Sequence, residues 1–332
     1  MPRIAGFGVG VALVVACATP DAGAGLLAQR KAYVGTDTMG VVPASPIAIR
    51  LQAPAELTEN SAATLSVTQP GVFFTINDSG HEPLLFAFDS TGASRGVWRV
   101  TGAKNQDWEA ASTGPCSVGG SDAARFAQAC VYIGETGNNN AKRPTRAIYR
   151  VREPAAEAAG FRGQLAPAKL VYRYPDQPHD VEAMYVAPNG DLYLITKRQL
   201  RDTTRRRRPA LVFKLPASAW SASALVTATL VDSLPIVPGS APLRQITDAA
   251  LSPDARHVAV RTYAQVYVFA ADSATGRIDV SVPPSVCNII AFERWQGEGV
   301  AWYGRSGKLL LTAEGRESPM HVIDCPMPSR RE

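Results

Sequence analysis

Beyond about residue 43 the chain is a succession of short apolar runs separated by turn residues, and it shows almost no helical periodicity. The runs are rich in β-branched and aromatic side chains, as in VFFTIND, VYIGET, LYLITK, HVAVRT and LLLTAE. Glycine, proline, asparagine and aspartate punctuate them, which is typical of strands joined by turns. The pattern therefore predicts an all-β chain.

A strand of small residues that opens on a polar side chain stands before each of these runs. The opening residues are Ser61, Glu109, Glu182, Asp248 and Glu298. They recur at intervals of roughly 50 to 70 residues, and a repeat of about 40 to 50 residues with inserted loops is typical of β-propeller blades. We predict a single five-bladed β-propeller. Six blades, one of them without a recognisable opening residue, are the alternative.

The last repeat runs out of chain after its third strand, at Asp324, whereas SPIAIRLQ at 45–52 is an extended run with no repeat of its own. We expect residues 46–52 to pair with the strand near 319–324, because this closure leaves no open edge in the ring. The propeller should then span 46–325, with 326–332 as a tail.

The N-terminus carries one arginine and then an apolar stretch, 4–16, that is too short to span a bilayer but fits a secretory signal. The sequence VVAC ending at Cys17 resembles the bacterial lipobox. We therefore predict a signal peptide over 1–17, a lipid anchor on Cys17 and a flexible tether over 18–45. Cleavage near 22–24 is the alternative. The protein should lie in the cell envelope, at the outer membrane or cell surface, or be secreted if it is not lipidated.

Export places the remaining four cysteines in an oxidising compartment, where an even number favours disulfides. Three pairings are possible. Cys116 and Cys130 flank a Gly- and Ala-rich excursion between two strands, so a bond between them would close the base of a long hairpin loop, and Cys287 would then pair with Cys325. No Cys/His spacing suggests zinc.

The composition fits a globular protein, with 332 residues of which 46% are hydrophobic and 19% charged. The net charge is only +5, and four of the positive charges form the run Arg205–Arg208, which we interpret as a solvated loop tip. The charge therefore favours no nucleic-acid partner. We expect a monomer.

The five opening residues should converge on the axis, because the first strand of each blade lines the centre of a propeller. Four carboxylates and a hydroxyl at such short range repel one another unless a cation lies among them. All are oxygen donors, which calcium prefers, so Ser61, Glu109, Glu182, Asp248 and Glu298 form a predicted Ca2+ site. Alternatively, the acids bind backbone amides in a wet channel, or the metal is purely structural.

The order Ser, Glu, Glu, short polar residue, Glu on these strands, with DWEAAS before VYIGET and HDVEAMYV before LYLITK, resembles the calcium-dependent apyrases. The resemblance covers 57–324 and implies a five-bladed propeller with one axial calcium that hydrolyses nucleoside di- and triphosphates. Asp248 stands where those apyrases have a second serine. The stretches NDSG, IGETGNNN and TKR are more similar to those of uncharacterised bacterial exported propellers.

A second group of polar residues ends the second strand of each blade and should surround the mouth of the channel. They are Asn77, Asp78, Glu135, Lys197, Arg198, Arg261 and Glu314. Cations beside acids suit an anionic ligand, with Lys197 and Arg261 holding phosphate, sulfate or carboxylate oxygens. In a metal-assisted hydrolase, Glu135 or Asp78 would be the general base. Alternatively, these groups form ion pairs that orient the ring carboxylates.

Two other classes of function fit the same sequence. A glycan-cleaving propeller would use Asp107, Asp180 and Glu298 across a groove lined by Trp108, Trp295 or Trp302. A non-catalytic propeller would bind a ligand or protein at the cell surface, as many propellers do. Neither a nucleophile elbow nor a phosphate-binding loop is present in the sequence.

Overall fold

The computed structural model describes residues 46–116, 128–197, 209–236, 242–290, 296–316 and 318–328. They all belong to one unit, Val34–Glu332. The predictions for 1–45, for Arg198 and Arg205–Arg208 and for Trp295 lie outside the described residues. None of the helices in the described ranges is long and apolar enough to cross a membrane.

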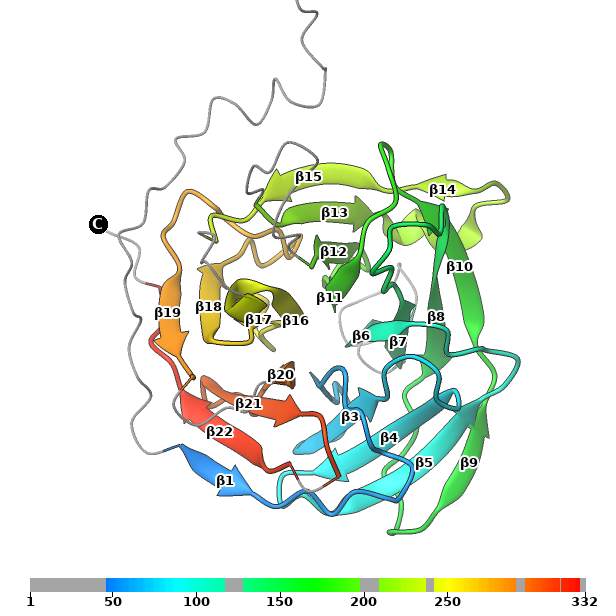
Figure 1. The fold of residues 1–332 in the computed structure, drawn as a ribbon, viewed down its shortest axis with the longest axis vertical. Helices are drawn as coiled ribbons and strands as arrows, with labels where there is room; N and C mark the ends of the chain where they lie inside the picture. Colours follow the sequence, from blue (N-terminus) through cyan, green and yellow to red (C-terminus); the bar gives the residue numbers. More distant parts are fainter. Residues whose placement is uncertain are drawn as a thin grey trace, which may run out of the picture. The chain divides into compact units, whose positions relative to one another are not determined.

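Five sheets stand around a common axis as the blades of a propeller, each with its inner strand nearest the axis (Figure 1). Blade 1 contains β2 (Thr64–Leu65), β3 (Val72–Ile76), β4 (Leu84–Asp89) and β5 (Ser94–Val100). Blade 2 contains β6 (Trp108–Pro115), β7 (Ala129–Glu135), β8 (Arg146–Arg152) and β10 (Ala168–Arg173). Blade 3 contains β11 (Val181–Val186), β12 (Leu192–Thr196), β13 (Leu211–Leu215) and β15 (Thr229–Ser233).

Blade 4 contains β16 (Ile246–Leu251), β17 (His257–Thr262), β18 (Gln265–Ala270) and β19 (Ser285–Asn288). Blade 5 contains β20 (Gly297–Trp302), β21 (Lys308–Ala313), β22 (Met320–Asp324) and β1 (Ile47–Ile49). The only helical pieces in the described ranges are the short 3-10 turns η1 (Ala217–Ser221) and η2 (Pro242–Arg244). The predicted all-β, five-bladed propeller is confirmed, and the six-bladed alternative is wrong.

The hydrophobic core consists of five clusters, and each one lies between two neighbouring blades. The cluster between blades 5 and 1, for example, joins Leu310 and Met320 to Phe73 and Phe86. The interface between the last blade and the first is therefore apolar, like the interfaces between the other neighbouring blades.

The inner strands consist of small residues because they crowd together around the axis. At Gly299, a Cβ atom would lie 2.3 Å from Oγ1 of Thr312 and 2.7 Å from the backbone of Ala62 and Ala63. No larger side chain fits where β20 approaches blade 1 this closely. The small-residue pattern thus follows from the geometry of the hub.

The first described strand completes the last blade. β1 pairs antiparallel with β22, with Ile47 opposite Val322 and Ile49 opposite Met320. A bridge from Gln52 to Ala93 continues the segment onto blade 1. The predicted closure of the ring is confirmed.

Two further short strands cross from one blade to the blade before it, and we call them the lap strands. β9 (Arg162–Leu165) leaves blade 2 and pairs in parallel with β5 of blade 1. β14 (Val226–Thr227) leaves blade 3 and pairs in parallel with β10 of blade 2. Each lap strand covers an outer edge that would otherwise be unpaired.

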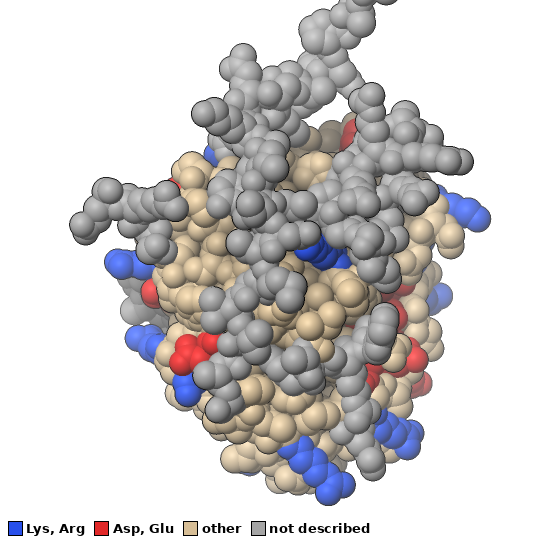
Figure 2. Space-filling model, turned by 60° about the vertical axis from the view of Figure 1, so that its left-hand side comes forward, with Lys and Arg blue, Asp and Glu red and all other residues tan. Residues whose placement is uncertain are grey.

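Both predicted disulfides are present. Cys116–Cys130 joins the outer ends of β6 and β7, and Cys287–Cys325 joins β19 of blade 4 to the segment after β22 of blade 5. The second bond therefore crosses an interface between blades. On the face seen in Figure 2, basic side chains are scattered singly over the described surface, which agrees with the balanced composition.

Candidate metal centre

The inner strands of blades 2 to 5 each begin with a break in the pairing register. The register skips Glu109 in β6, Glu182 in β11 and Thr247 in β16. In β20 the shift falls within the interval that contains Glu298. A β-bulge takes its extra residue out of the regular alternation, and bulges are common beside functional sites. The opening residues of blades 2, 3 and 5 therefore occupy equivalent bulges at the hub.

Blade 4 departs from this arrangement because its bulge holds Thr247, so that Asp248 comes one position later. The buried carboxylate of Asp248 accepts backbone N–H bonds from Ala63 at 3.2 Å, from Val300 at 2.8 Å and from Ala249 at 2.8 Å. Burial raises its pKa well above the ordinary value, although these donors oppose the shift. Asp248 thus ties blade 4 to blades 5 and 1, the amide-binding role that we considered as an alternative.

Glu109 belongs to a group of acids between blades 1 and 2, which we call the three-carboxylate cluster. Oxygens of Asp78, Asp107 and Glu109 all lie within 4.8 Å of one another. Ser61 Oγ donates a 2.8 Å hydrogen bond to Oε2 of Glu109. The backbone of Gly137 packs directly against the cluster, since a Cβ there would lie 2.6 Å from Cγ of Glu109 and 2.7 Å from Cγ of Asp107.

The cluster is partly withdrawn from water, and this destabilises its charged form. Glu109 and Asp107 are buried, and Asp78 is half-buried. Burial raises the pKa of Glu109 well above its ordinary value, and the charges of Glu182 and Asp78 raise it further. Burial also raises the pKa of Asp107, against the opposing charge of Arg143, whose Nη2 contacts Oδ2 of Asp107.

A lysine neutralises the neighbouring part of the hub. Nζ of Lys197 lies 2.5 Å from Oε1 of Glu182. Burial by itself lowers the pKa of Lys197, but its interactions with Glu182, Tyr263 and Glu109 together outweigh burial, and the net shift is upward. Burial raises the pKa of Glu182 despite this partner. Burial likewise raises the pKa of Glu298, whose Oε1 accepts a 3.1 Å hydrogen bond from the hydroxyl of Tyr263. Lys197 therefore has the ion-pairing role of our alternative interpretation.

The other two predicted catalytic residues are engaged within the protein. Arg261 is 0% exposed, and its Nη1 donates 2.6 Å bonds to the carbonyls of Gly299 and Thr312. Glu135 is buried, lies 3.3 Å from Nη2 of Arg146 and accepts a 3.0 Å bond from the backbone N–H of Gln106. Arg261 thus lies in the interior, and the expected pair of Lys197 and Arg261 at the mouth of a channel does not form.

Glu314, at the end of β21, differs from these groups because it is only half-buried. Burial, followed by the nearby charges of Glu298, Glu59 and Asp78, raises the pKa of Glu314 to about 7. A carboxyl group with such a pKa exchanges protons readily near neutral pH.

The structure therefore brings Ser61, Glu109, Glu182 and Glu298 to the hub but joins only Glu109 to the three-carboxylate cluster. Asp107 was missing from the predicted metal ligands, although the motif Asp-x-Glu occurs in both DWEAAS and HDVEAM. Because the same motif opens two of the inner strands, its repetition is the signal that could have revealed Asp107. Gly137 has no comparable signal, because its contact depends on a loop.

The cluster satisfies one geometric condition for binding a hard divalent cation, the short separation of its oxygens. Two oxygens that share one calcium at 2.3–2.6 Å cannot be more than about 5 Å apart. The 4.8 Å limit within the cluster satisfies this condition, and all the donors are oxygens. The packed backbone of Gly137 keeps the space beside the acids free of a side chain.

Of the tryptophans proposed for a sugar-binding groove, the two within the described residues give it no support. Trp108 is 0% exposed and Trp302 is 3% exposed, so neither ring can stack on a ligand. Of the proposed glycosidase acids, Asp107 contacts Arg143 and Asp180 accepts a 2.5 Å bond from the backbone N–H of Asn138.

Comparisons with known proteins find similar solved structures but no related sequence. No protein-family model matches the chain, and a search of curated proteins finds no match. Among solved structures, the major allergen Mala s 1 of Malassezia sympodialis has a TM-score of 0.51 at 9% identity, over 85% of this chain and 97% of the allergen. The gluconolactonase XC5397 of Xanthomonas campestris has a TM-score of 0.39 at 14% identity, over 86% and 88%.

The PQQ-bound aldose sugar dehydrogenase of Streptomyces coelicolor is a further match, with a TM-score of 0.41 at 12% identity, over 85% of this chain and 99% of the dehydrogenase. At 9% identity, the likeness to Mala s 1 shows the fold alone. The chain is a five-bladed β-propeller. Its resemblance to the calcium-dependent apyrases stays a prediction.

Proposed function

We propose that this protein is a calcium-binding β-propeller that binds an anionic ligand without catalysis. The observation that carries the proposal is the three-carboxylate cluster, in which Asp78, Asp107 and Glu109 offer oxygens within 4.8 Å of one another. Calcium prefers such oxygen donors and tolerates an irregular shell, to which Ser61 and water would contribute. A bound divalent cation would also relieve the repulsion that raises the pKa of Glu109.

Binding is favoured over phosphoryl transfer because the cations expected to stabilise a reacting phosphate are committed elsewhere. Arg261 is buried against backbone carbonyls, and Lys197 is paired with Glu182. Catalysis of phosphoryl transfer depends on cations aimed at the charge that develops in the transition state.

Calcium-dependent hydrolysis of nucleotides or phosphate esters is the second candidate, and one observation favours it. Glu314 has a pKa of about 7 and interacts with Asp78, so it would be the general base. A screen of nucleoside di- and triphosphates with and without calcium separates the two candidates. Phosphate release that depends on calcium and falls about 100-fold or more in Glu314→Gln would replace the binding proposal with the hydrolase.

We also propose that the protein is exported and lipidated on Cys17. The two disulfides support export, because such bonds persist in oxidising compartments. Mass spectrometry of the mature N-terminus tests lipidation, and an unmodified N-terminus beyond Ala18 would contradict it.

Calcium binding is tested by thermal unfolding of the chelator-treated protein during a calcium titration. A site that binds only the folded state adds about 2.7 kcal/mol at a hundredfold excess over the Kd. Asp78→Asn should weaken binding by at least about tenfold, whereas Asp324→Asn, an exposed acid on β22, should leave it unchanged. Equal calcium responses in the parent and Asp78→Asn would refute the site.

A further inference from the structure

A cavity of about 420 Å³ lies in blade 2, outside the three-carboxylate cluster. One wall is the loop of blade 1 that leads into β6, from Gly102 to Gln106. The opposite wall is formed by β8 and β10 and by the segment 143–146 before β8. This volume is within the usual range for small-molecule sites and far exceeds that of a single water molecule.

The lining of this cavity carries an excess of positive charge. Its basic members are Lys104, Arg143, Arg146 and Lys169, and its one acid is Glu135. Glu135 interacts with both arginines, at 3.3 Å from Arg146 and 3.7 Å from Arg143. Lys104 and Lys169 are exposed and make no ion pair within the described part of the chain. Two positive charges are thus available to a ligand.

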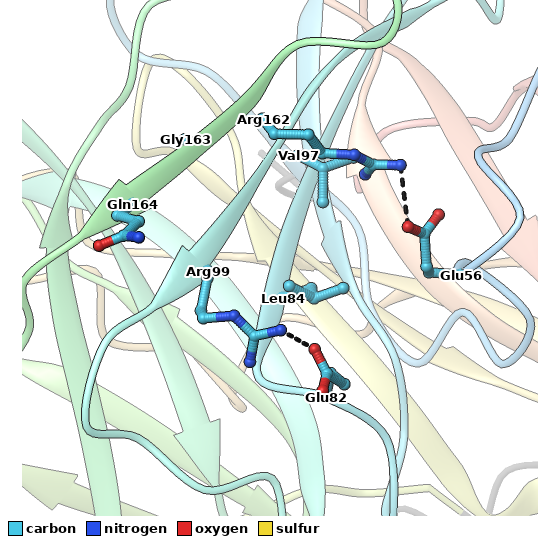
Figure 3. Close-up of a pocket in the computed structure, with 8 residues that line it drawn as sticks. All are labelled: Glu56, Glu82, Leu84, Val97, Arg99, Arg162, Gly163 and Gln164. Atoms are coloured by element: carbon cyan, nitrogen blue, oxygen red, sulfur yellow. Dashed lines mark hydrogen bonds and ion pairs between the residues drawn. The ribbon is translucent and has the colours of Figure 1, made fainter.

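A second cavity, in blade 1, provides a comparison because it is larger but electrically balanced. Its volume is about 570 Å³, and Figure 3 shows that its two arginines are paired. Arg162 lies 2.8 Å from Glu56, and Arg99 contacts Glu82. No charge is left over there, so an anion gains little from entering it. Charge, not size, therefore distinguishes the blade 2 cavity.

Arg146 is fixed at the inner side of the blade 2 cavity. It is 3% exposed, and its Nε has no hydrogen-bond acceptor among the described residues. Because water cannot reach this Nε, a ligand in the cavity cannot contact it, and Arg146 serves to hold Glu135 at 3.3 Å.

Besides Gln106 and Thr145, the remaining lining of the cavity is apolar or aromatic. Tyr149, Ala147, Val171 and Pro144 line it, and Nζ of Lys169 lies 5.4 Å from the centroid of the Tyr149 ring. A bare inorganic ion would leave this surface uncovered. The cavity instead suits an oxyanion attached to a small organic skeleton that covers the exposed Pro144 and Val171.

We propose that the blade 2 cavity binds a small organic oxyanion, a phosphate monoester or a carboxylate, with Lys104 and Lys169 as its recognition residues. Lys197 and Arg261, the cations expected from the sequence, have no part in it. The proposal identifies the anionic ligand of the proposed function but does not require calcium.

The test is isothermal titration in chelator-containing buffer with glucose 6-phosphate, glucuronate and glucose as probes. At least one of the two anionic sugars should bind, and glucose should not. The preferred anion identifies phosphate or carboxylate as the recognised group. The proposal is overturned if neither anion binds at concentrations up to about 10 mM, or if glucose binds equally well.

Variants locate the binding in the cavity. The double variant Lys104→Ala/Lys169→Ala removes two exposed side chains, so it should fold normally, and we expect it to bind at least about tenfold more weakly. Lys142→Ala is the matched control, since Lys142 is exposed in the neighbouring loop but does not line the cavity. If both variants lose the same amount of affinity for the anion, the loss reflects the overall charge of the protein, and the site is refuted.

Failure of this proposal is distinguishable from failure of the calcium proposal. Anion binding is measured without calcium, and calcium binding is measured without the anion. Anion binding with no calcium response would leave the cavity proposal intact and remove the calcium site.

Discussion

Replacing Gly137 by alanine tests whether the three-carboxylate cluster binds its cation through a defined geometry. The added Cβ would lie 2.6 Å from Cγ of Glu109, 2.7 Å from Cγ of Asp107 and 2.9 Å from Oε1 of Glu109. All three distances are below ordinary van der Waals contact. Gly137 is not among the glycines with positive φ, so the substitution strains the packing and not the backbone.

The cost of this substitution should fall mainly on the calcium-bound state. Without a cation the two acids repel each other and can move apart, whereas a bound cation draws their oxygens together against the new methyl group. Overpacking typically costs about 1–3 kcal/mol. If most of this overpacking energy destabilises the calcium-bound state, the Kd for calcium should rise by about 10- to 100-fold, since 1.4 kcal/mol corresponds to a factor of ten.

The assay is a calcium titration by isothermal calorimetry, together with thermal unfolding in chelator. We expect the calcium-free Tm of Gly137→Ala to fall by less than about 3 °C, because 1 kcal/mol moves the Tm of a domain of this size by about 2–4 °C. Asn140→Ala, an exposed position in the same loop, is the control. An unchanged Kd in Gly137→Ala would mean that the two carboxylates do not converge on a shared cation.

Deleting 46–52 removes β1 and the buried Leu51, so the Tm should fall by roughly 10 °C, and a truncated protein that melts like the parent would contradict the energetic role of the closure. The raised pKa of Glu314, about 7 against an ordinary value of 4.5, means that its protonated form stabilises the fold at low pH and that this contribution is lost as pH rises through 7. Between pH 5 and pH 8 in chelator, the Tm of Glu314→Gln should therefore decrease less than the Tm of the parent. If the two proteins show the same dependence of Tm on pH, this reasoning is refuted. Arg143 contacts Asp107 and also lines the blade 2 cavity, so Arg143→Ala should tighten calcium binding about threefold or more while weakening anion binding. Calorimetry with each ligand measures both effects, and a calcium affinity that does not rise would exclude competition at Asp107.

The number of blades and the closure of the ring follow from a repeated local pattern. The spacing of the cysteines favours the pairing that the structure has, but it does not exclude the other two. The position of a bulge does not have such a signature. TDAALS looks like a match to WEAAST, but the pairing of β16 with β17 places Thr247, and not Asp248, at the bulge. The identity of the fourth hub residue therefore depends on cross-strand register.

The surroundings of the basic residues could not be predicted for a similar reason. Arg261 occurs in HVAVRT, where alternation alone does not reveal whether the arginine meets solvent or backbone carbonyls. Burial against Gly299 and Thr312 results from the neighbouring blade. The blade 2 cavity likewise draws Lys104 from one blade and Lys169 from another, so residues far apart in sequence meet only after the ring forms.

The lap strands and β1 have a consequence for the order in which the chain can fold. The outer edge of blade 1 stays unpaired until β9, which ends at Leu165, is available. The outer edge of blade 2 stays unpaired until β14, which ends at Thr227, is available. β1, the earliest described strand, must wait for β22, almost at the other end of the described chain. A chain released from its N-terminus onward can therefore complete blades 3 and 4 from strands within a single stretch of the chain, whereas blades 1, 2 and 5 each need a strand from another part of the chain. Such distant partners slow folding, so incomplete chains should keep exposed strand edges until the last blade is free.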